Sequence, residues 1–305
     1  TPLERRSAPI LTGFTDLDQL LGGMQRSDLL VLAARPSVGK TALALDIARH
    51  VGTRQKVPVG LFSLEMSKEQ LVDRLLCAES NVDLWKMRTG RLSDRPEDDD
   101  FPRIGHAMGV LSEASIFIDD SPNTNILQMR TKARRLQAEH GLGLIIIDYL
   151  QLMESRGNIE NRVQEVSEIT RGLKGLAREL NVPVLALSQL SRAVEQSKPA
   201  IPKLSHLRES GSIEQDADVV IFIYRKAADK NYRLEDVPPD ERYLAELHID
   251  KHRNGPTGLV KVIFNENITS FRNMDTQFKP QGPAAAAPAL KPKSAFAKKT
   301  EMPPM

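Results

Sequence analysis

The sequence Ala34-Arg-Pro-Ser-Val-Gly-Lys-Thr41 follows directly on an apolar run, Leu29 to Ala33. The apolar run predicts a buried strand, and the spacing of apolar residues after Thr41 predicts a helix that ends near Gly52. A strand, a loop of small residues and a helix, in this order, are the setting of a phosphate-binding loop. There, backbone N–H groups and the N-terminus of the helix bind an anion.

Two side chains of this loop have expected roles toward a nucleotide. Lys40 would reach the β- and γ-phosphates, and the hydroxyl of Thr41 would hold Mg²⁺. Ala34 stands where the usual pattern has its first glycine, so an accidental Gly-Lys-Thr before an ordinary helix is the alternative. The residues expected to bind the phosphates are Ser37, Val38, Gly39, Lys40, Thr41 and Ala42.

Length and composition limit the class of protein. The 305 residues, of which 40% are hydrophobic, suffice for one large α/β domain or two small ones. The net charge of +2 excludes an overall basic field, so nucleic acid would bind through a local patch or an assembled channel. A single cysteine, Cys77, excludes an internal disulfide and suits a reducing cytoplasm. No apolar run approaches the ~20 residues of a membrane span.

Composition also predicts how the chain is divided. Residues 1–11 read as a linker or the end of an incoming helix, and residues 12–275 as one α/β domain. Residues 276–305 are rich in Pro, Ala and Lys and cannot bury enough apolar surface to order themselves, so we expect a disordered tail. The start at Thr1, rather than at a methionine, predicts a fragment that lacks an upstream domain.

Three further apolar runs end in polar side chains. Val57–Glu65 predicts a strand that ends in Glu65, a candidate base for an attacking water; a solvated strand-end acid is the alternative. Gly143–Asp148 predicts a strand buried on both faces, whose Asp148 can hold Mg²⁺ directly or through water. Val182–Gln189 predicts a strand whose terminal amide can sense the γ-phosphate or the water.

The stretches between these runs are less specific. Residues 80–110 mix charge and proline and predict a solvated surface excursion. Asp119 and Asp120 end a short predicted strand, where turn or capping roles are favoured over metal binding. Ser67 and Gln70 predict a capping box at the start of a helix.

The C-terminal half predicts a hairpin with a basic tip. Residues 244–250 alternate in polarity and predict one strand, residues 259–264 predict the second strand of the hairpin, and residues 251–258 form the turn. Lys251 and Arg253 at this tip point away from their own core, so they could reach a neighbouring subunit. An ordinary basic hairpin tip remains the alternative.

Taken together, these stretches resemble the motor domain of DnaB-type replicative DNA helicases over about residues 10–275. The motifs stand in the order seen in that family: Ala33-Ala-Arg-Pro-Ser-Val-Gly-Lys-Thr41, Phe62-Ser-Leu-Glu-Met66, Ile146-Ile-Asp-Tyr-Leu-Gln-Leu152, Ser188-Gln-Leu-Ser-Arg192, Leu207-Arg-Glu-Ser-Gly-Ser-Ile-Glu-Gln-Asp-Ala-Asp218 and Lys251-His-Arg-Asn-Gly255.

The resemblance implies a fold and a set of roles. The fold is a RecA-like P-loop domain, with a mostly parallel central sheet, helices on both faces and a C-terminal β-hairpin. Subunits assemble into a hexameric ring that binds ATP and Mg²⁺ at its interfaces and single-stranded DNA in its channel. A helicase loader and a primase are further implied partners, the primase through an N-terminal collar that this sequence lacks.

The same resemblance assigns residues to these roles. Thr41 and Asp148 match the magnesium positions, and the Arg208–Gly211 loop matches the segment that follows the DNA backbone, through Arg208, Glu209 and Gly211. His252 receives no role. The resemblance matches catalytic positions of the family to Lys40, Glu65, Gln189, Lys251 and Arg253, the last two donated in trans.

Three functional hypotheses stay open from the sequence. The first is an ATP-driven helicase that translocates on DNA. The second is a RecA-like recombinase or repair ATPase, which shares the core but forms filaments. The third is a non-catalytic, nucleotide-gated scaffold, against which the set Lys40, Glu65 and Asp148 argues.

Overall fold

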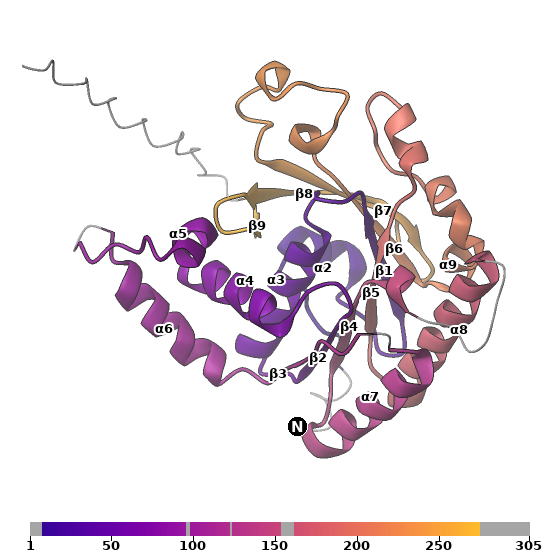
Figure 1. Cartoon of the computed structure of the whole chain (residues 1–305). Helices are drawn as coiled ribbons and strands as arrows, with labels where there is room; N and C mark the ends of the chain where they lie inside the picture. The colour runs from indigo at the N-terminus through magenta and orange to yellow at the C-terminus, as the bar shows by residue number, and fades with distance from the viewer. Residues whose placement is uncertain (1–7, 96–97, 123, 154–161, 275–305) are drawn as a thin grey trace, which may run out of the picture. The chain divides into compact units, whose positions relative to one another are not determined.

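The computed structural model describes residues 8–95, 98–122, 124–153 and 162–274. Their framework is a nine-stranded sheet with the order β3-β2-β4-β5-β1-β6-β7-β8-β9 (Figure 1). The first six strands in this order are parallel, and β7, β8 and β9 continue the sheet in antiparallel fashion. The strands are β1 Leu29–Ala34, β2 Val59–Ser63, β3 Ile116–Asp119, β4 Leu144–Asp148, β5 Val184–Gln189, β6 Val219–Tyr224, β7 Leu244–His252, β8 Gly258–Asn265 and β9 Ser270–Asn273.

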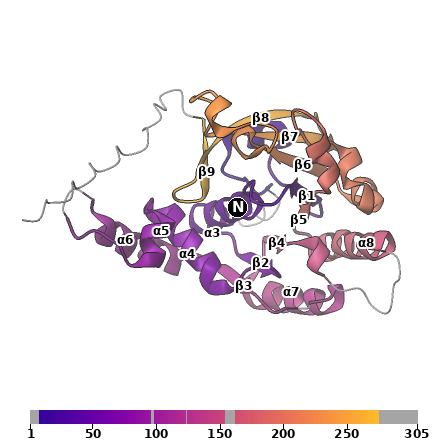
Figure 2. The ribbon, with the colours of Figure 1, turned by 45° about the horizontal axis from the view of Figure 1, so that its top comes forward.

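Helices cover both faces of this sheet, as a parallel sheet requires because both of its faces are apolar. Figure 2 shows α3 and α4 on one side of the strands and α8 on the other. The helices are α2 Thr15–Leu21, α3 Lys40–Thr53, α4 Lys68–Ser80, α5 Leu84–Thr89, α6 Asp100–Ser112, α7 Ile126–His140, α8 Arg162–Leu180 and α9 Gly211–Asp216. None of the helices in the described part of the chain combines the length and apolarity that a bilayer crossing requires.

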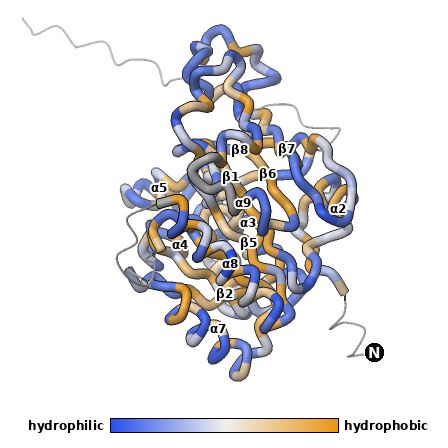
Figure 3. Tube along the Cα trace, turned by 90° about the vertical axis from the view of Figure 1, so that its right-hand side faces the viewer, coloured by the Kyte–Doolittle hydropathy of each residue, from blue (hydrophilic) through white to orange (hydrophobic). Residues whose placement is uncertain are grey.

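Alternation along the central strand divides the core in two. Leu30 and Leu32 of β1 pack with residues of α2, α3 and α4, whereas Leu29, Val31 and Ala33 pack with residues of α7, α8 and α9. The hydropathy colouring of the chain shows apolar segments along the strands and hydrophilic segments on the periphery (Figure 3). Two apolar layers around one sheet confirm the predicted mostly parallel α/β architecture and its C-terminal hairpin.

Two local predictions concern the start of α4 and the segment of residues 80–110. The capping box at Ser67 is present at the start of α4, and Asp120 accepts a hydrogen bond from the backbone of Lys68 at 2.9 Å, a capping role. The surface excursion expected over residues 80–110 contains α5 and α6, of whose residues only Asp100 and Ala107 are buried. Residue Pro102 lies in the first turn of α6, where proline is tolerated, so its presence did not exclude a helix.

Candidate active site

The phosphate loop joins β1 to α3 at the C-terminal edge of the parallel strands. Gly39 precedes the helix with φ +116°, a conformation that favours glycine, and a Cβ on it would lie 2.8 Å from the Phe271 ring. Gly39 therefore has both a conformational and a steric reason to be glycine. No side chain caps the first turn of α3, so its backbone N–H groups are available to an anion.

Lys40, Thr41 and Asp148 meet at this edge. The Thr41 hydroxyl donates to Asp148 Oδ2 at 2.6 Å, and Lys40 Nζ lies 3.6 Å from Asp148 Oδ1 and 4.0 Å from the centre of the Tyr149 ring. Burial lowers the pKa of Lys40, while the charges of Asp148 and Glu65 oppose that shift. The buried lysine thus stands among acceptors rather than in water, as a phosphate-binding cation would.

A divalent cation fits the Asp148 carboxylate. Asp148 is 1% exposed, and its buried Oδ1 atom has no hydrogen bond to any residue that the structure describes, although a buried carboxylate oxygen normally has a partner. Oxygen ligands from one carboxylate and one hydroxyl, completed by water and phosphate, are the usual setting of Mg²⁺. Among the described residues, no group of three or more His, Cys, Asp or Glu side chains could hold a metal by itself. The nucleotide would therefore supply part of the coordination.

The pocket above the loop has a volume of about 370 Å³. It brings together Glu65, from the loop after β2, and Gln189, from the end of β5. The strand predicted to end at Glu65 stops at Ser63, and Glu65 is exposed two residues later. The predicted phosphate-loop residues that line the pocket are Ser37, Gly39, Lys40, Thr41 and Ala42. Val38 instead lines a neighbouring cavity of about 350 Å³ on the β6 side of the loop.

Gln189 is held by a residue to which the sequence assigned no role. The backbone N–H of Gln189 donates to Gln151 Oε1 at 3.1 Å. Gln151 Nε2 donates to Ser188 Oγ at 2.9 Å and to the Gln189 carbonyl at 3.0 Å. Gln151 follows β4, so this amide ties the ends of β4 and β5 together. Gln151 lies within the motif Ile146–Leu152 that carries the family resemblance, but the resemblance assigned it no role.

Other pocket residues were also missed. Arg74 of α4 lines the pocket, its Nε atom is buried without a hydrogen bond, and burial lowers the pKa of its guanidinium. Phe264 of β8 and Thr269 of the turn before β9 line the pocket, and the guanidinium of Arg225 lies 4.0 Å from the centre of the Phe264 ring. These residues come from elements far apart in the sequence, so only the fold could join them to the phosphate loop.

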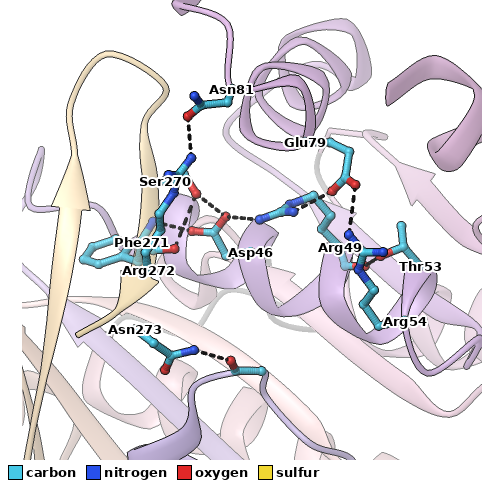
Figure 4. A network of polar contacts seen from close by, with 11 residues as sticks. Asp46, Arg49, Thr53, Arg54, Glu79, Asn81, Ser270, Phe271, Arg272 and Asn273 are labelled. Carbon is cyan, nitrogen blue, oxygen red and sulfur yellow. Dashed lines mark hydrogen bonds and ion pairs between the residues drawn. The ribbon is translucent and has the colours of Figure 1, made fainter. Parts of the chain in front are cut away.

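A buried carboxylate anchors those C-terminal strands to the phosphate-loop helix. Asp46 of α3 accepts hydrogen bonds from the Ser270 hydroxyl at 2.7 Å and from the Phe271 backbone at 2.6 Å, and it pairs with Arg49 at 3.2 Å (Figure 4). Burial raises the pKa of Asp46 to about 6, against the opposing effects of Arg49 and these hydrogen bonds. The network holds the Phe271 ring against Gly39.

Lys251 and Arg253, the predicted trans-acting cations, lie at the opposite end of the parallel strands. His252, between them, pairs with Val219 at the start of β6, whereas the phosphate loop follows the end of β1. The two ends of the parallel strands are separated by the length of β1, whose six residues span about 17 Å from first to last. Lys251 and Arg253 are therefore remote from the phosphate loop of their own chain.

The predicted DNA-contacting segment is described only as backbone. Arg208 and Glu209 lie in a 3-10 helix, Leu204–Ser210, and Gly211 begins α9. Their side chains lie outside what the structure describes, so these assignments stay predictions.

Comparison with known proteins gives the family. A family model described as the DnaB-like helicase C terminal domain matches residues 9–273. The replicative DNA helicase DnaB of Geobacillus stearothermophilus is 53% identical over 270 residues, which cover 88% of this chain and 57% of that protein. The replicative DNA helicase DnaC of Bacillus subtilis is 50% identical over 274 residues, 90% of this chain and 58% of that protein. The chain thus spans somewhat more than half the length of these relatives.

Solved structures agree with this relationship. A DnaB-like replicative helicase, studied with its interactions with primase, superposes with a TM-score of 0.81 at 36% identity, covering 88% of this chain and 62% of that one. A separate ATPase domain gives a TM-score of 0.80 at 36% identity and covers 90% of this chain and 95% of that one. These similarities confirm the RecA-like fold, and the chain belongs to the family of DnaB-like helicase C-terminal domains.

Proposed function

We propose that this chain is the motor domain of a replicative DNA helicase. Subunits form a hexameric ring, hydrolyse ATP at their interfaces, and use that hydrolysis to translocate on single-stranded DNA and separate the duplex. The named activities of relatives such as the DnaB of Geobacillus stearothermophilus support this proposal. So does the convergence of Lys40, Thr41 and Asp148 at the C-terminal edge of the sheet.

ATP and Mg²⁺ would be held by this edge. The uncapped first turn of α3 and Lys40 would bind the phosphates, and Thr41 and Asp148 would hold Mg²⁺, which offsets phosphate charge when bound. Glu65 would accept the proton of the attacking water, and Gln189 would hydrogen-bond to that water or to the γ-phosphate. Glu65 is exposed on the open side of the pocket, where a water can reach it.

One observation carries the proposal: the two parts of the predicted catalytic set lie at opposite ends of the parallel strands. Lys40, Glu65 and Gln189 lie at their C-terminal ends, and Lys251 and Arg253 lie at their N-terminal ends. A molecule with complementary surfaces at two different edges associates head to tail, into a ring or a spiral. In such an assembly Lys251 and Arg253 of one subunit reach the nucleotide of the next. An arginine that stabilises the transition-state charge in this way contributes ~10³–10⁵ in rate. Loss of the γ-phosphate removes its partner, so hydrolysis loosens the interface.

DNA and protein partners complete the proposal. Backbone groups and cations of the Arg208–Gly211 segment would grip DNA phosphates without reading base sequence, repeated around the ring, so that a chain of net charge +2 needs no overall basic surface. A primase is a proposed partner, supported by the structural relative studied with its primase, and a loader is another. The protein would act in the cytoplasm, where the DNA of bacterial relatives is replicated.

The test is the variant Arg253→Ala. We expect DNA-stimulated ATP hydrolysis to fall by about 10³-fold or more, because the transition-state charge loses its partner, while nucleotide affinity is largely retained. The matched control is Lys261→Ala, which removes an exposed cation from the same hairpin and should leave turnover unchanged. Unchanged turnover of Arg253→Ala in an assembled oligomer would remove the trans role. Strand exchange without unwinding would favour a recombinase, and hydrolysis no faster than that of Lys40→Ala would favour a scaffold.

A further inference from the structure

Both predicted trans-acting cations are hydrogen-bonded within their own chain. Lys251 Nζ donates to the backbone carbonyls of Glu214 and Gln215, and Arg253 Nη2 donates to the Gln215 carbonyl at 3.0 Å. These carbonyls stand at the C-terminal end of α9, where unpaired C=O groups and the helix dipole favour cations. Arg253 Nη1 also pairs with Asp218 Oδ1 at 3.0 Å. We call Asp218 and these two carbonyls the α9 socket.

A bulge in β7 directs the two cations to the socket. Ile221 pairs with Ile249, but its neighbour Val220 pairs with Lys251, so Asp250 is an extra residue between them. Side chains alternate between the faces of a strand, and one inserted residue reverses the faces of all that follow. Ile249 packs in the α3 layer of the core, whereas Val220 packs in the α8 and α9 layer. Without the bulge, Lys251 and Arg253 would lie on the α3 side.

Asp218 is itself firmly fixed. It is 2% exposed, and its Oδ2 atom accepts hydrogen bonds from the Leu29 backbone at 2.8 Å and from Lys174 Nζ. Its own carbonyl accepts the backbone N–H of Arg253 at 2.8 Å. A carboxylate so buried is costly unless its oxygens are all engaged. The other oxygen is engaged by Arg253, which indicates that the arginine belongs to this buried network.

The socket leaves Arg253 able to act on a second partner. A guanidinium has five N–H donors in a fixed plane; among the described residues, the hydrogen bond to the Gln215 carbonyl uses one of them, and the ion pair with Asp218 engages the other terminal nitrogen. The side chain is 42% exposed, so the remaining donors can face an anion from outside the chain. Held at two points, the planar group loses less conformational freedom on meeting that anion than a free side chain would.

We propose that Asp218 is a positioning residue, which orients Arg253 through the α9 socket so that its free donors meet the nucleotide of the neighbouring subunit. This inference rests on the proposed function, because it assumes the trans role of Arg253. Asp218 touches no nucleotide and would act only through the arginine. Its removal therefore affects turnover at the neighbour's site and leaves nucleotide binding at its own site intact.

The experiment uses the full chain carrying Asp218→Asn, which keeps an acceptor for the Leu29 backbone but removes the charge opposite Arg253. We expect kcat for DNA-stimulated hydrolysis to fall by about 10- to 100-fold, with little change in KM for ATP, since displacing a catalytic group by about 1 Å has effects of this size. Asp236→Asn is the matched control, because it makes the same change of charge at an exposed acid in the segment between β6 and β7. It should keep wild-type turnover.

Mixed oligomers separate positioning from a folding defect. Asp218→Asn subunits keep an intact phosphate loop, and Lys40→Ala subunits keep an intact socket, so random 1:1 mixing creates a complete site at about one interface in four. We expect hydrolysis to reappear in the mixture although each variant alone is nearly inactive. A parallel mixture of Arg253→Ala with Lys40→Ala tests the trans site itself.

The outcomes are distinct. Recovery in both mixtures supports the socket. Recovery with Arg253→Ala but not with Asp218→Asn, or wild-type turnover of Asp218→Asn alone, overturns the positioning role and leaves the proposed function standing. No recovery in either mixture contradicts the trans site, and the socket with it. If Asp218→Asn has lost nucleotide binding, Asp218→Glu, which keeps the charge for Lys174 but shifts it by one methylene, is carried through the same mixtures.

Discussion

At the scale of single residues, Asp148 is the group on which the site depends. Its Oδ2 atom accepts the Thr41 hydroxyl at 2.6 Å, while its buried Oδ1 atom has no hydrogen bond among the described residues and forms an ion pair with Lys40 at 3.6 Å. A buried carboxylate oxygen without a hydrogen bond costs free energy unless a ligand supplies one. Under the function proposed above, a magnesium ion bound beside the phosphate loop would satisfy this oxygen.

Substitution of Thr41 tests this arrangement. Thr41→Val removes the hydroxyl and keeps the shape, so we expect hydrolysis to fall by about 100-fold, equivalent to roughly 3 kcal/mol of lost charge stabilisation. Thr41→Ser keeps the hydroxyl and should retain most activity, and chelation of Mg²⁺ should abolish wild-type turnover. The measurement is steady-state hydrolysis across a magnesium titration. A valine variant with the wild-type magnesium dependence would show that Thr41 does not hold the ion.

Asp46 predicts a specific dependence of stability on pH. Its pKa is raised from 3.8 to about 6 in the folded state, so the folded chain holds this proton more tightly than the unfolded chain does. Between about pH 4 and 6, unfolding releases the proton and stability falls as pH rises, by about 3 kcal/mol in total. Asp46→Asn should lack this component, whereas Asp236→Asn, at an exposed position, should keep it.

Chemical denaturation at a series of pH values measures that difference. The expected result is a gap between the free energies of unfolding of wild type and Asp46→Asn that changes by about 3 kcal/mol from pH 4 to pH 6.5. A gap that stays constant over this range would mean that the Asp46 carboxylate titrates alike in both states.

Residues next to a strand end were predictable, and residues brought in by distant elements were not. Lys40, Asp148 and Gln189 each follow an apolar run, and the carboxyl ends of parallel strands share one edge, so pattern alone brought them together. Arg74 belongs to α4, and nothing in the sequence distinguishes this pocket-lining arginine from a solvated one. Arg225 and Phe264 join the pocket region only through the order of β6, β7 and β8.

At the scale of elements, apolar runs and the capping box predicted helices and strands better than composition did. The long apolar runs became β1, β4 and β6, all fully buried, and the capping box correctly placed the start of α4. The helices α5 and α6 escaped prediction because few of their residues are buried. Asp83, which caps α5 through the backbone N–H groups of Trp85 and Lys86, was the available signal.

The cap of α4 gives an element-scale prediction. Ser67 accepts from the Gln70 backbone, and the Gln70 side chain accepts from the Ser67 backbone, so two otherwise unpaired N–H groups are satisfied. Ser67→Ala should lower the free energy of unfolding by about 1 kcal/mol, while Ser67→Asp, another good cap, should cost little. Urea denaturation measures both. Equal losses for the two variants would argue that the hydroxyl has a role other than capping.

The β7 bulge shows what no pattern of polarity could predict. Strict alternation over residues 244–253 would have put Lys251 and Arg253 on the same face as Ile249. One additional residue, Asp250, reverses the face of both cations. The sequence correctly predicted the hairpin and expected Lys251 and Arg253 to point away from their own core; it did not predict their contacts with the end of α9 and with Asp218.

At the scale of the whole molecule, the sheet separates two half-sites. The phosphate loop opens at one edge, and Arg253 lies at the other, bound to the residue that precedes β6. Neither half can complete the other within one chain, because β1 and β6 hold them apart. A complete site of the proposed kind therefore requires contact between the phosphate-loop end of one molecule and the hairpin end of the next.

The measurement that tests this claim most directly is ATP hydrolysis by a mixture of Lys40→Ala and Arg253→Ala chains. Each variant alone should be nearly inactive, and mixing them before assembly should restore hydrolysis in proportion to the interfaces that join an intact loop to an intact arginine. A mixture no more active than its two separate components, under conditions where oligomers form, would contradict an active site shared between subunits.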